Sequence, residues 1–313
     1  MSETTELAAY YAAIEASARV LDVPCSRETV WPILTAYEHA IAAQPVIAFR
    51  VATGKRHVGE LDCRFLMPPD DLDSAYSLAV ESGLVPATDH PAGSLLAEVH
   101  ERFPLDTSGI DFGVVGGFKK TWSFFPPDRL QKISDLAALP SMPPGLGENA
   151  DYFSRFGLDD RVSVVGIDYR NHTMNVYFGE LPDGCLSPEN IRAMHRDIEL
   201  PEPSERMIAL GGQSFGLYAT LRWDVPRIER ISFSVMAPDP KDLPVRFDAK
   251  IEELVRNPPY GAPERNVVYV AMSATEGEYY KLQSYYRWQS QMTELMLLAE
   301  AEQDAAPEDA GAR

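Results

Sequence analysis

Residues Gly116 to Phe125, GGFKKTWSFF, have the composition of a β-strand with aromatic rings on both sides of two lysines. Side chains of a strand alternate between its two faces. We therefore predict one face with Phe118, Lys120, Trp122 and Phe124, and another with Lys119, Thr121, Ser123 and Phe125. A lysine buried among rings needs an anion or a path to water. Either the strand is a sheet edge or something negative binds at Lys120.

Similar strand pairs recur along the chain. Hairpins are predicted to start near residues 46, 108, 161, 213 and 266, at a spacing of roughly 50 to 60 residues that is typical of a repeated supersecondary unit. The strands are predicted at 46–53, 59–67, 108–115, 117–125, 161–169, 173–180, 213–223, 228–237, 266–273 and 278–286. Helical periodicity is found at 5–21, 27–42, 71–82, 91–102, 128–137, 147–156, 187–199, 203–209, 240–256 and 288–302. The Pro-rich stretch 139–147 is predicted to be a turn without a helix.

This order predicts an α+β fold of five αββα repeats. Ten antiparallel strands can close into a barrel with a central ligand cavity and a ring of helices outside, which removes the exposed sheet edges. An open antiparallel sheet with helices on one face is the alternative. We expect residues 1–302 to form this single domain and residues 303–313, rich in Ala, Asp and Pro, to be a disordered tail.

Composition restricts the partners. Among the 313 residues, 28 Lys and Arg stand against 47 Asp and Glu, giving a net charge of −19 that disfavours nucleic acid and anionic membranes. The chain has no 18-residue apolar run and no signal-peptide pattern at its start, so we expect a cytoplasmic protein. We also expect a monomer. Cys25, Cys63 and Cys185 form no C-x-x-C pair, which disfavours disulfides and zinc.

Several strands combine an apolar face with a mixed face. Mixed faces turned inward would line a cavity, although each one alone could equally face solvent. The inward set contains cations and hydrogen-bonding groups suited to a phosphate or diphosphate, unless each cation simply pairs with a carboxylate. This set is Lys120, Arg230 and Lys281, with Asn175, Tyr177 and Tyr218.

Aromatic residues accompany these cations. A cage of rings could shelter a carbocation from water, although strand aromatics are by default core. The rings are Trp122, Tyr177, Phe215, Tyr218 and Tyr285. Asp62 is a candidate Mg²⁺ ligand, since Mg²⁺ commonly takes one or two carboxylates plus substrate phosphates. Arg64, on the same strand face, could neutralise a diphosphate without metal or pair with Asp62.

Five stretches together resemble the bacterial soluble aromatic prenyltransferases. They are GGFKKTWSFFP (116–126), LPSMPPGLGENADYFSRFGLD (139–159), residues 169–178 with NVYF, SFGLYATLRWD (214–224) and EYYKLQSYY (278–286). Within that family the chain looks most like the members that transfer geranyl to hydroxynaphthalenes. The resemblance implies the αββα prenyltransferase barrel of secondary metabolism, in agreement with the five repeats.

The resemblance also implies site roles. Diphosphate-binding positions correspond to Lys120, Asn175, Tyr218, Arg230 and Lys281, of which Lys120, Tyr218, Arg230 and Lys281 would be catalytic, and the Mg²⁺ position to Asp62. The isoprenoid and acceptor pocket corresponds to Trp122, Tyr177, Phe215, Gly216, Ser234, Val268 and Tyr285. Four positions depart from the family pattern: Arg64 and Asn171 alter charge around the diphosphate, and Ser163 and Gln283 reshape the acceptor pocket. Gln283 in place of glycine favours dimethylallyl over geranyl.

The expected function is therefore transfer of a dimethylallyl or geranyl group from an allyl diphosphate to a ring carbon of a phenolic or hydroxynaphthalene-type acceptor. No organic cofactor and no covalent nucleophile are expected, and Mg²⁺ is a possible cofactor. The alternatives are a non-catalytic barrel that binds an anionic aromatic metabolite, and a metal-dependent phosphatase built on Asp62.

Overall fold

The ten predicted strands form one closed antiparallel barrel. The structure, a computed structural model, describes residues 3–42, 46–53, 59–67, 75–237, 239 and 247–286. Its strands are β1 (Ile47–Ala52), β2 (Asp62–Met67), β3 (Thr107–Gly113), β4 (Gly117–Phe124), β5 (Val162–Asp168), β6 (Thr173–Phe178), β7 (Gly216–Arg222), β8 (Arg230–Met236), β9 (Arg265–Ser273) and β10 (Gly277–Tyr285). Each strand pairs with its neighbours in sequence, and β1 closes the circle against β10. The open-sheet alternative is therefore wrong.

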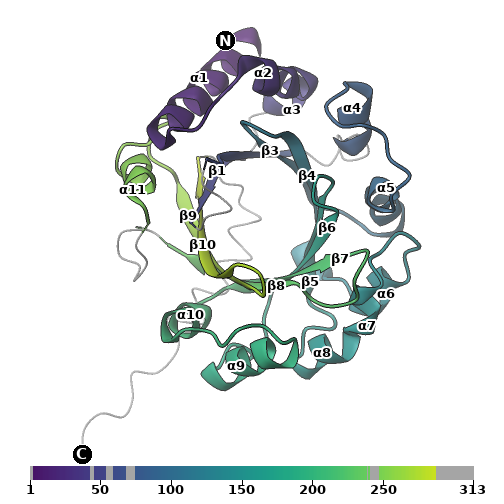
Figure 1. Cartoon of the computed structure of the whole chain (residues 1–313). Coiled ribbons are helices and arrows are strands. Elements are labelled where there is room, and N and C mark those ends of the chain that lie inside the picture. Colours follow the sequence, from purple (N-terminus) through teal and green to yellow (C-terminus); the bar gives the residue numbers. More distant parts are fainter. Residues whose placement is uncertain are drawn as a thin grey trace, which may run out of the picture.

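Helices surround the barrel between successive hairpins (Figure 1). They are α1 (Glu3–Leu21), α2 (Arg27–Ala36), α3 (Glu38–Ala42), α4 (Ala75–Glu81), α5 (Ala92–Arg102), the 3₁₀ turn η3 (Pro127–Arg129), α6 (Ile133–Ala137), α7 (Gly145–Glu148), α8 (Ala150–Arg155), α9 (Pro188–Asp197), α10 (Glu205–Gly211) and α11 (Ala249–Arg256). One prediction was wrong in detail, because the Pro-rich stretch holds the start of α7. The predicted helix 288–302, the tail 303–313 and residues 71–74 and 240–246 lie outside the described residues.

The helix starts follow local sequence signals. Ser26 caps α2 as expected, since its hydroxyl accepts a hydrogen bond from the Glu28 amide at 3.2 Å. Ser187 caps α9 in the same way ahead of Pro188, a residue that suits the first helical position. These caps satisfy amide groups that the first turn of a helix leaves without partners.

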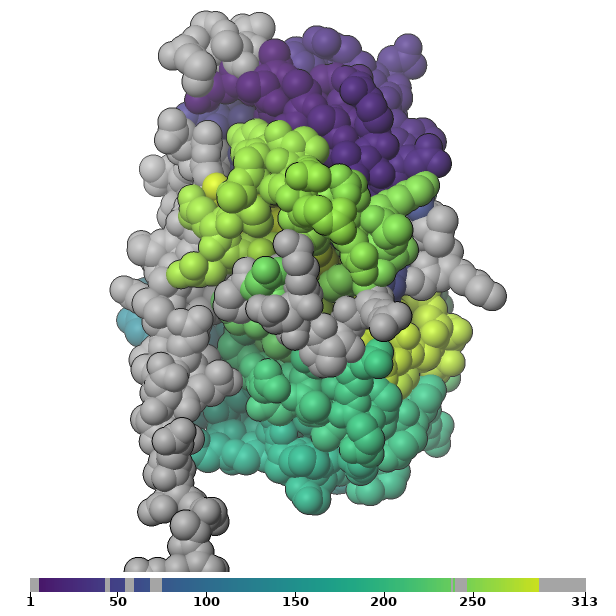
Figure 2. All heavy atoms as spheres, turned by 90° about the vertical axis from the view of Figure 1, so that its left-hand side faces the viewer, coloured from purple at the N-terminus to yellow at the C-terminus, as the bar shows by residue number. Residues whose placement is uncertain are grey.

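Alternation along the strands produces two apolar regions. Outward side chains such as Phe65, Phe233 and Leu282 pack between the barrel and the helices, in the main core. On one side of the molecule, α1 and α11 pack against each other over this layer (Figure 2). A smaller cluster that includes Trp122 and Tyr285 lies inside the barrel. Burial of each large apolar side chain stabilises the fold by about 1.5–3 kcal/mol, so the outer core supports the barrel while its interior stays partly open.

Strand β4 departs from strict alternation. Lys120 pairs with Asp111 and Phe118 with Phe112, so Lys119 is an extra residue in β4, a β-bulge. Phe118 therefore packs outward, where its ring stacks with Tyr37, and Lys119 joins Lys120 at the barrel cavity. The predicted faces are wrong for Phe118 and Lys119 and are confirmed for Lys120, Trp122 and Phe124.

None of the described helices is long and apolar enough to cross a membrane.

Candidate active site

A charged cavity of about 250 Å³ opens at one end of the barrel. We call it the polar mouth, and its charged lining residues are Arg50, Glu60, Asp62, Lys119, Lys120, Asp168, Arg170, Arg222, Glu229, Arg230 and Lys281. These side chains come from hairpin strands and turns of all five repeats. The barrel thus gathers, at one place, cations that are far apart in the sequence.

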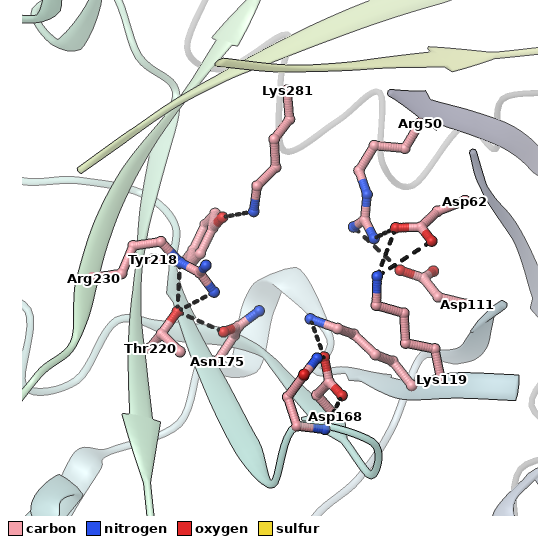
Figure 3. A network of polar contacts seen from close by, with 12 residues as sticks. Arg50, Asp62, Asp111, Lys119, Asp168, Asn175, Tyr218, Thr220, Arg230 and Lys281 are labelled. Atoms are coloured by element: carbon pink, nitrogen blue, oxygen red, sulfur yellow. Dashed lines mark hydrogen bonds and ion pairs between the residues drawn. The ribbon is translucent and has the colours of Figure 1, made fainter. Parts of the chain in front are cut away.

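Two carboxylates near β1 and β2 are neutralised by cations. Asp62 accepts hydrogen bonds from Arg50 and from Lys119, and the Lys119 Nζ lies 3.0 Å from the Asp62 Oδ2 (Figure 3). Although burial alone would raise the pKa of Asp62, Arg50 and Lys119 hold that pKa well below its usual range. Asp111 is bound by Arg64 through Nε at 2.6 Å and Nη2 at 3.1 Å, and Arg50 lies 3.3 Å away.

A third carboxylate, Asp168, binds Lys120 with an Nζ to Oδ2 distance of 3.1 Å. Asn171 donates to both oxygens of Asp168, through its backbone amide at 2.9 Å and its side chain at 3.0 Å. Burial acts to lower the pKa of Lys120, and Asp168 opposes that shift. For Lys120, the alternative that a cation of the cavity pairs with a carboxylate is therefore confirmed.

Arg230 and Lys281 differ from the other cations. Arg230 donates to the Thr220 hydroxyl at 2.9 and 3.1 Å and to the Tyr279 hydroxyl at 2.8 Å. Lys281 donates to the Tyr218 hydroxyl at 2.8 Å. Among the described residues neither cation has a carboxylate partner, and Figure 3 shows the contacts of Arg230 with Thr220 and of Lys281 with Tyr218. Two half-buried cations that bind hydroxyl groups, with no carboxylate partner in the described part of the chain, form a site suited to an anion.

Lys281 and Tyr218 form a pair with shifted acidities. Burial, with Arg230 as a neighbouring cation, lowers the pKa of Lys281 to about 7. Burial would raise the pKa of Tyr218, but Lys281 and Arg230 outweigh it and lower that pKa to about 7. Because the two groups share a hydrogen bond, they titrate as a pair near neutral pH.

Aromatic residues line a second cavity inside the barrel, which we call the aromatic chamber. Its lining includes Arg64, Trp122, Phe124, Ser163, Tyr177, Phe215, Gly216, Ser234, Tyr269 and Tyr285. Tyr177 lies edge-on to Trp122 at 5.4 Å and contacts the Tyr218 ring at 4.6 Å. The Lys120 Nζ lies 5.7 Å from the Trp122 ring centre, so mouth and chamber are adjacent. The faces of these rings can stabilise a cation.

One of the two glycines opposite Trp122 gives the indole its space. Gly109 and Gly166 are its cross-strand partners in β3 and β5. A Cβ atom on Gly166 would lie 2.3 Å from Cζ3 of Trp122, closer than atoms can approach. The other side of the indole faces Arg64, whose Cζ lies 4.1 Å from the ring centre. The Trp122 ring thus contacts the backbone of Gly166 and the guanidinium of Arg64.

The structure places the predicted residues as follows. Asp62, Lys120, Asn171, Arg230 and Lys281 line the polar mouth, with Asn175 and Tyr218 buried beside it. Trp122, Ser163, Tyr177, Phe215, Gly216, Ser234 and Tyr285 line the aromatic chamber. Arg64 also lies in the chamber, away from the predicted diphosphate group. Gln283 is buried at 1% exposure on the inner face of β10, opposite Arg50.

The prediction for Val268 was wrong. Val268 packs in the outer core, and its neighbours Val267 and Tyr269 face the barrel interior. The segment around it, VVYVAM (267–272), alternates no charged or strongly polar residue with its apolar ones, so the sequence carries no pattern that could fix the face.

The sequence interpretation missed several residues of the site, among them Arg50, Lys119, Asp168 and Tyr269. Arg50 was detectable, because the apolar Ile47, Phe49 and Val51 share the opposite face of β1. Asp168 and Tyr269 lie in strands of mixed or apolar character that gave no such signal. Lys119 was not detectable by alternation, since the bulge reverses its face.

The residues around Asp62 do not fit a Mg²⁺ site. Magnesium needs free carboxylate oxygens, yet Arg50 and Lys119 occupy those of Asp62, and two cations beside them would repel a third. Within the described part of the chain, no three His, Cys, Asp or Glu side chains gather as metal ligands. The carboxylate of Asp62 is thus arranged to bind the side chains of Arg50 and Lys119 rather than a metal ion.

Comparisons with known proteins agree with this geometry. The family model described as aromatic prenyltransferase Orf2 matches residues 5–296. The 5,10-dihydrophenazine-1-carboxylate 9-dimethylallyltransferase of Streptomyces anulatus is 52% identical, covering 96% of this chain and 100% of that protein. The furaquinocin biosynthesis prenyltransferase of Streptomyces sp. (strain KO-3988) is 49% identical, covering 91% and 92%. Flaviolin linalyltransferase of Streptomyces virginiae is 48% identical, covering 93% and 95%.

Among solved structures, 5-dimethylallyltryptophan synthase from Streptomyces coelicolor shares the fold, with a TM-score of 0.51, 11% sequence identity, and coverage of 89% of this chain and 96% of that one. The family model and the relatives at about half identity carry the assignment. The chain therefore belongs to the aromatic prenyltransferase Orf2 family and is an enzyme that transfers prenyl groups to aromatic acceptors.

Proposed function

We propose that the polar mouth holds the diphosphate of an allyl donor and that the aromatic chamber receives its hydrocarbon part together with the acceptor. Arg230 and Lys281 are the primary diphosphate ligands, because they have no carboxylate to neutralise them among the described residues. Lys120, Asn175 and Tyr218 complete the contacts. Cations fixed before the reaction stabilise negative charge as it develops on the leaving group.

The reaction proceeds by electrophilic aromatic substitution. The bond between the allylic carbon and the diphosphate oxygen breaks, and its electron pair stays on the oxygen. The allyl cation lies against the faces of Tyr177, Tyr218 and Trp122, which lower its energy. An electron-rich ring carbon of the acceptor forms the new carbon–carbon bond, and the proton on that carbon then leaves to water. Walls of the chamber exclude water until the bond has formed.

Dimethylallyl diphosphate is the proposed donor. Gln283 lies buried on the inner face of β10 and occupies space that a longer isoprenoid would need. The relative from Streptomyces anulatus is named as a dimethylallyltransferase, which agrees with this choice. Geranyl diphosphate is the second candidate, and the acceptor is a phenolic or related fused-ring aromatic molecule.

We also propose that the reaction needs no Mg²⁺. Among the described residues that line the polar mouth, seven Arg and Lys stand against four Asp and Glu, an excess of three positive charges. The cations are Arg50, Lys119, Lys120, Arg170, Arg222, Arg230 and Lys281, and the carboxylates are Glu60, Asp62, Asp168 and Glu229. This excess is opposite in sign and similar in size to the charge of an allyl diphosphate, so the protein itself provides the neutralisation that Mg²⁺ would otherwise supply.

The observation that carries the proposal is the pair Arg230 and Lys281 beside an aromatic wall. It is tested by incubating the protein with dimethylallyl and geranyl diphosphate and a panel of aromatic acceptors. Mass spectrometry should detect acceptors that gain one isoprenyl unit, with one diphosphate released for each. Diphosphate release without such a product would instead indicate a hydrolase.

A further inference from the structure

Arg64 lies in the aromatic chamber, where the reaction itself calls for no cation. We infer that Arg64 binds a carboxylate on the acceptor, so that the preferred acceptors are aromatic acids. This inference rests on the proposed function and specifies the substrate class of the same site.

Only part of the hydrogen-bonding capacity of the Arg64 guanidinium is used by the described part of the protein. Its Nε and Nη2 bind Asp111 at 2.6 and 3.1 Å. A guanidinium carries five N–H groups, and the three that remain have no partner among the described residues. These belong to the Nη1 and Nη2 end, which forms a second fork matching the two oxygens of a carboxylate.

The position of this free end is fixed. Arg64 is 7% exposed and is held on one side by Asp111 and on another by the Trp122 ring, 4.1 Å from Cζ. An arginine fixed by stacking and by two hydrogen bonds loses little further freedom when it binds a ligand. The chamber therefore presents a prearranged anion site.

A purely structural role for Arg64 does not account for its charge. Asp62 and Asp111 together carry two negative charges, and Arg50, Arg64 and Lys119 surround them with three positive ones. Asp111 would still be paired with Arg50 at 3.3 Å if Arg64 were neutral. The group has one positive charge in excess, and Arg64 is the member that reaches the aromatic chamber.

Of the described residues that line the aromatic chamber, Arg64 is the only charged one. Its partner Asp111 is shared with Arg50, so the excess positive charge of this group extends to the Arg64 end. That charge would repel the allyl cation that forms beside Trp122. A carboxylate on the acceptor removes that repulsion and fixes which ring carbon faces the donor.

The test compares matched acceptors with dimethylallyl diphosphate as donor. A hydroxynaphthoic acid, a hydroxybenzoic acid and phenazine-1-carboxylic acid in its dihydro form are each paired with their methyl esters. The wild-type protein is expected to show kcat/KM about 10- to 100-fold higher for the acid, the range for a hydrogen bond to a charged group. Arg64→Gln should bring this ratio close to one, and Arg64→Lys should retain part of it.

Arg129→Gln, a change of an arginine whose side chain is 62% exposed on η3, is the control and should leave the ratio unchanged. Equal rates for acids and esters with the wild-type protein would overturn the inference while leaving prenyl transfer intact. No prenylation of any acceptor would instead overturn the proposed function. If Arg64→Gln fails to fold, the wild-type ratio of acid to ester still decides, and calorimetric binding of the acids provides a second measurement.

Discussion

Lys119 and Asp62 form an ion pair across the polar mouth, with Nζ 3.0 Å from Oδ2. The pair exists because a β-bulge in β4 turns Lys119 inward next to Lys120. Two consecutive residues thus point into one cavity, which regular alternation forbids. The bulge adds a cation at the place where the donor's diphosphate is proposed to lie.

Replacement of Lys119 by methionine should therefore impair the enzyme. The change removes one cation from the mouth and leaves Asp62 with Arg50 alone. We expect kcat/KM for dimethylallyl diphosphate to fall about tenfold, equal to about 1.4 kcal/mol. Lys250→Met is the matched control, because the side chain of Lys250 is 52% exposed and pairs with Asp22 outside the barrel. Equal values for wild type and Lys119→Met would show that Lys119 does not act on the donor.

Donor binding should weaken as the pH rises from 7 to 9. The pair of Lys281 and Tyr218 loses a proton near pH 7, because burial and nearby cations lower the pKa of Lys281 to about 7. A bound diphosphate favours the protonated pair, so affinity is full below that pH and is lost above it. Calorimetric titration of a non-reactive donor analogue should show the decline. Lys281→Arg keeps its charge to higher pH and should shift the decline upward; an unchanged profile would contradict this account.

Gly166→Ala should damage acceptor binding more than donor binding. The new Cβ would lie 2.3 Å from Cζ3 of Trp122 and force the indole into the aromatic chamber. Overpacking of this kind costs about 1–3 kcal/mol, so we expect KM for the acceptor to rise at least about fivefold while donor affinity changes little. Gly147→Ala is the control, because its Cβ would meet only Ala137 at 3.5 Å. An unchanged acceptor KM would show that Trp122 has room to move.

Chelation should not abolish turnover. Arg50 and Lys119 occupy the Asp62 carboxylate, and the mouth supplies its own positive charge. Rates measured in EDTA and in excess Mg²⁺ should agree within about twofold, a difference of about 0.4 kcal/mol. Loss of activity in EDTA that returns with Mg²⁺ would show that a metal displaces Arg50 or Lys119 from Asp62.

The barrel was predictable because five hairpins repeat at regular spacing and most strands have one apolar face. In β2 and β8 the apolar face identified the outer side, and so placed Asp62, Arg64 and Arg230 inside. Alternation failed where its signal was absent or broken. Val268 lies in a uniformly apolar strand, and Lys119 lies at a bulge that no residue type announces.

The partners of the individual cations could not be predicted from the sequence. The sequence grouped Lys120, Arg230 and Lys281 as equivalent cations, but cross-strand register places Asp168 opposite Lys120. It places Thr220 opposite Arg230 and Tyr269 opposite Lys281. Only register, which depends on the closed barrel, separates a neutralised cation from one that can accept a ligand.

The most direct test of the central claim is calorimetric titration of dimethylallyl S-thiolodiphosphate, a donor analogue that does not ionise readily. The account predicts that Arg230→Met and Lys281→Met each weaken binding at least about tenfold, since each removes a charge-assisted contact. Arg256→Met, which changes an arginine with a 55% exposed side chain on α11, should bind like wild type. Wild-type affinity in both Arg230→Met and Lys281→Met would contradict the assignment of the diphosphate to the polar mouth.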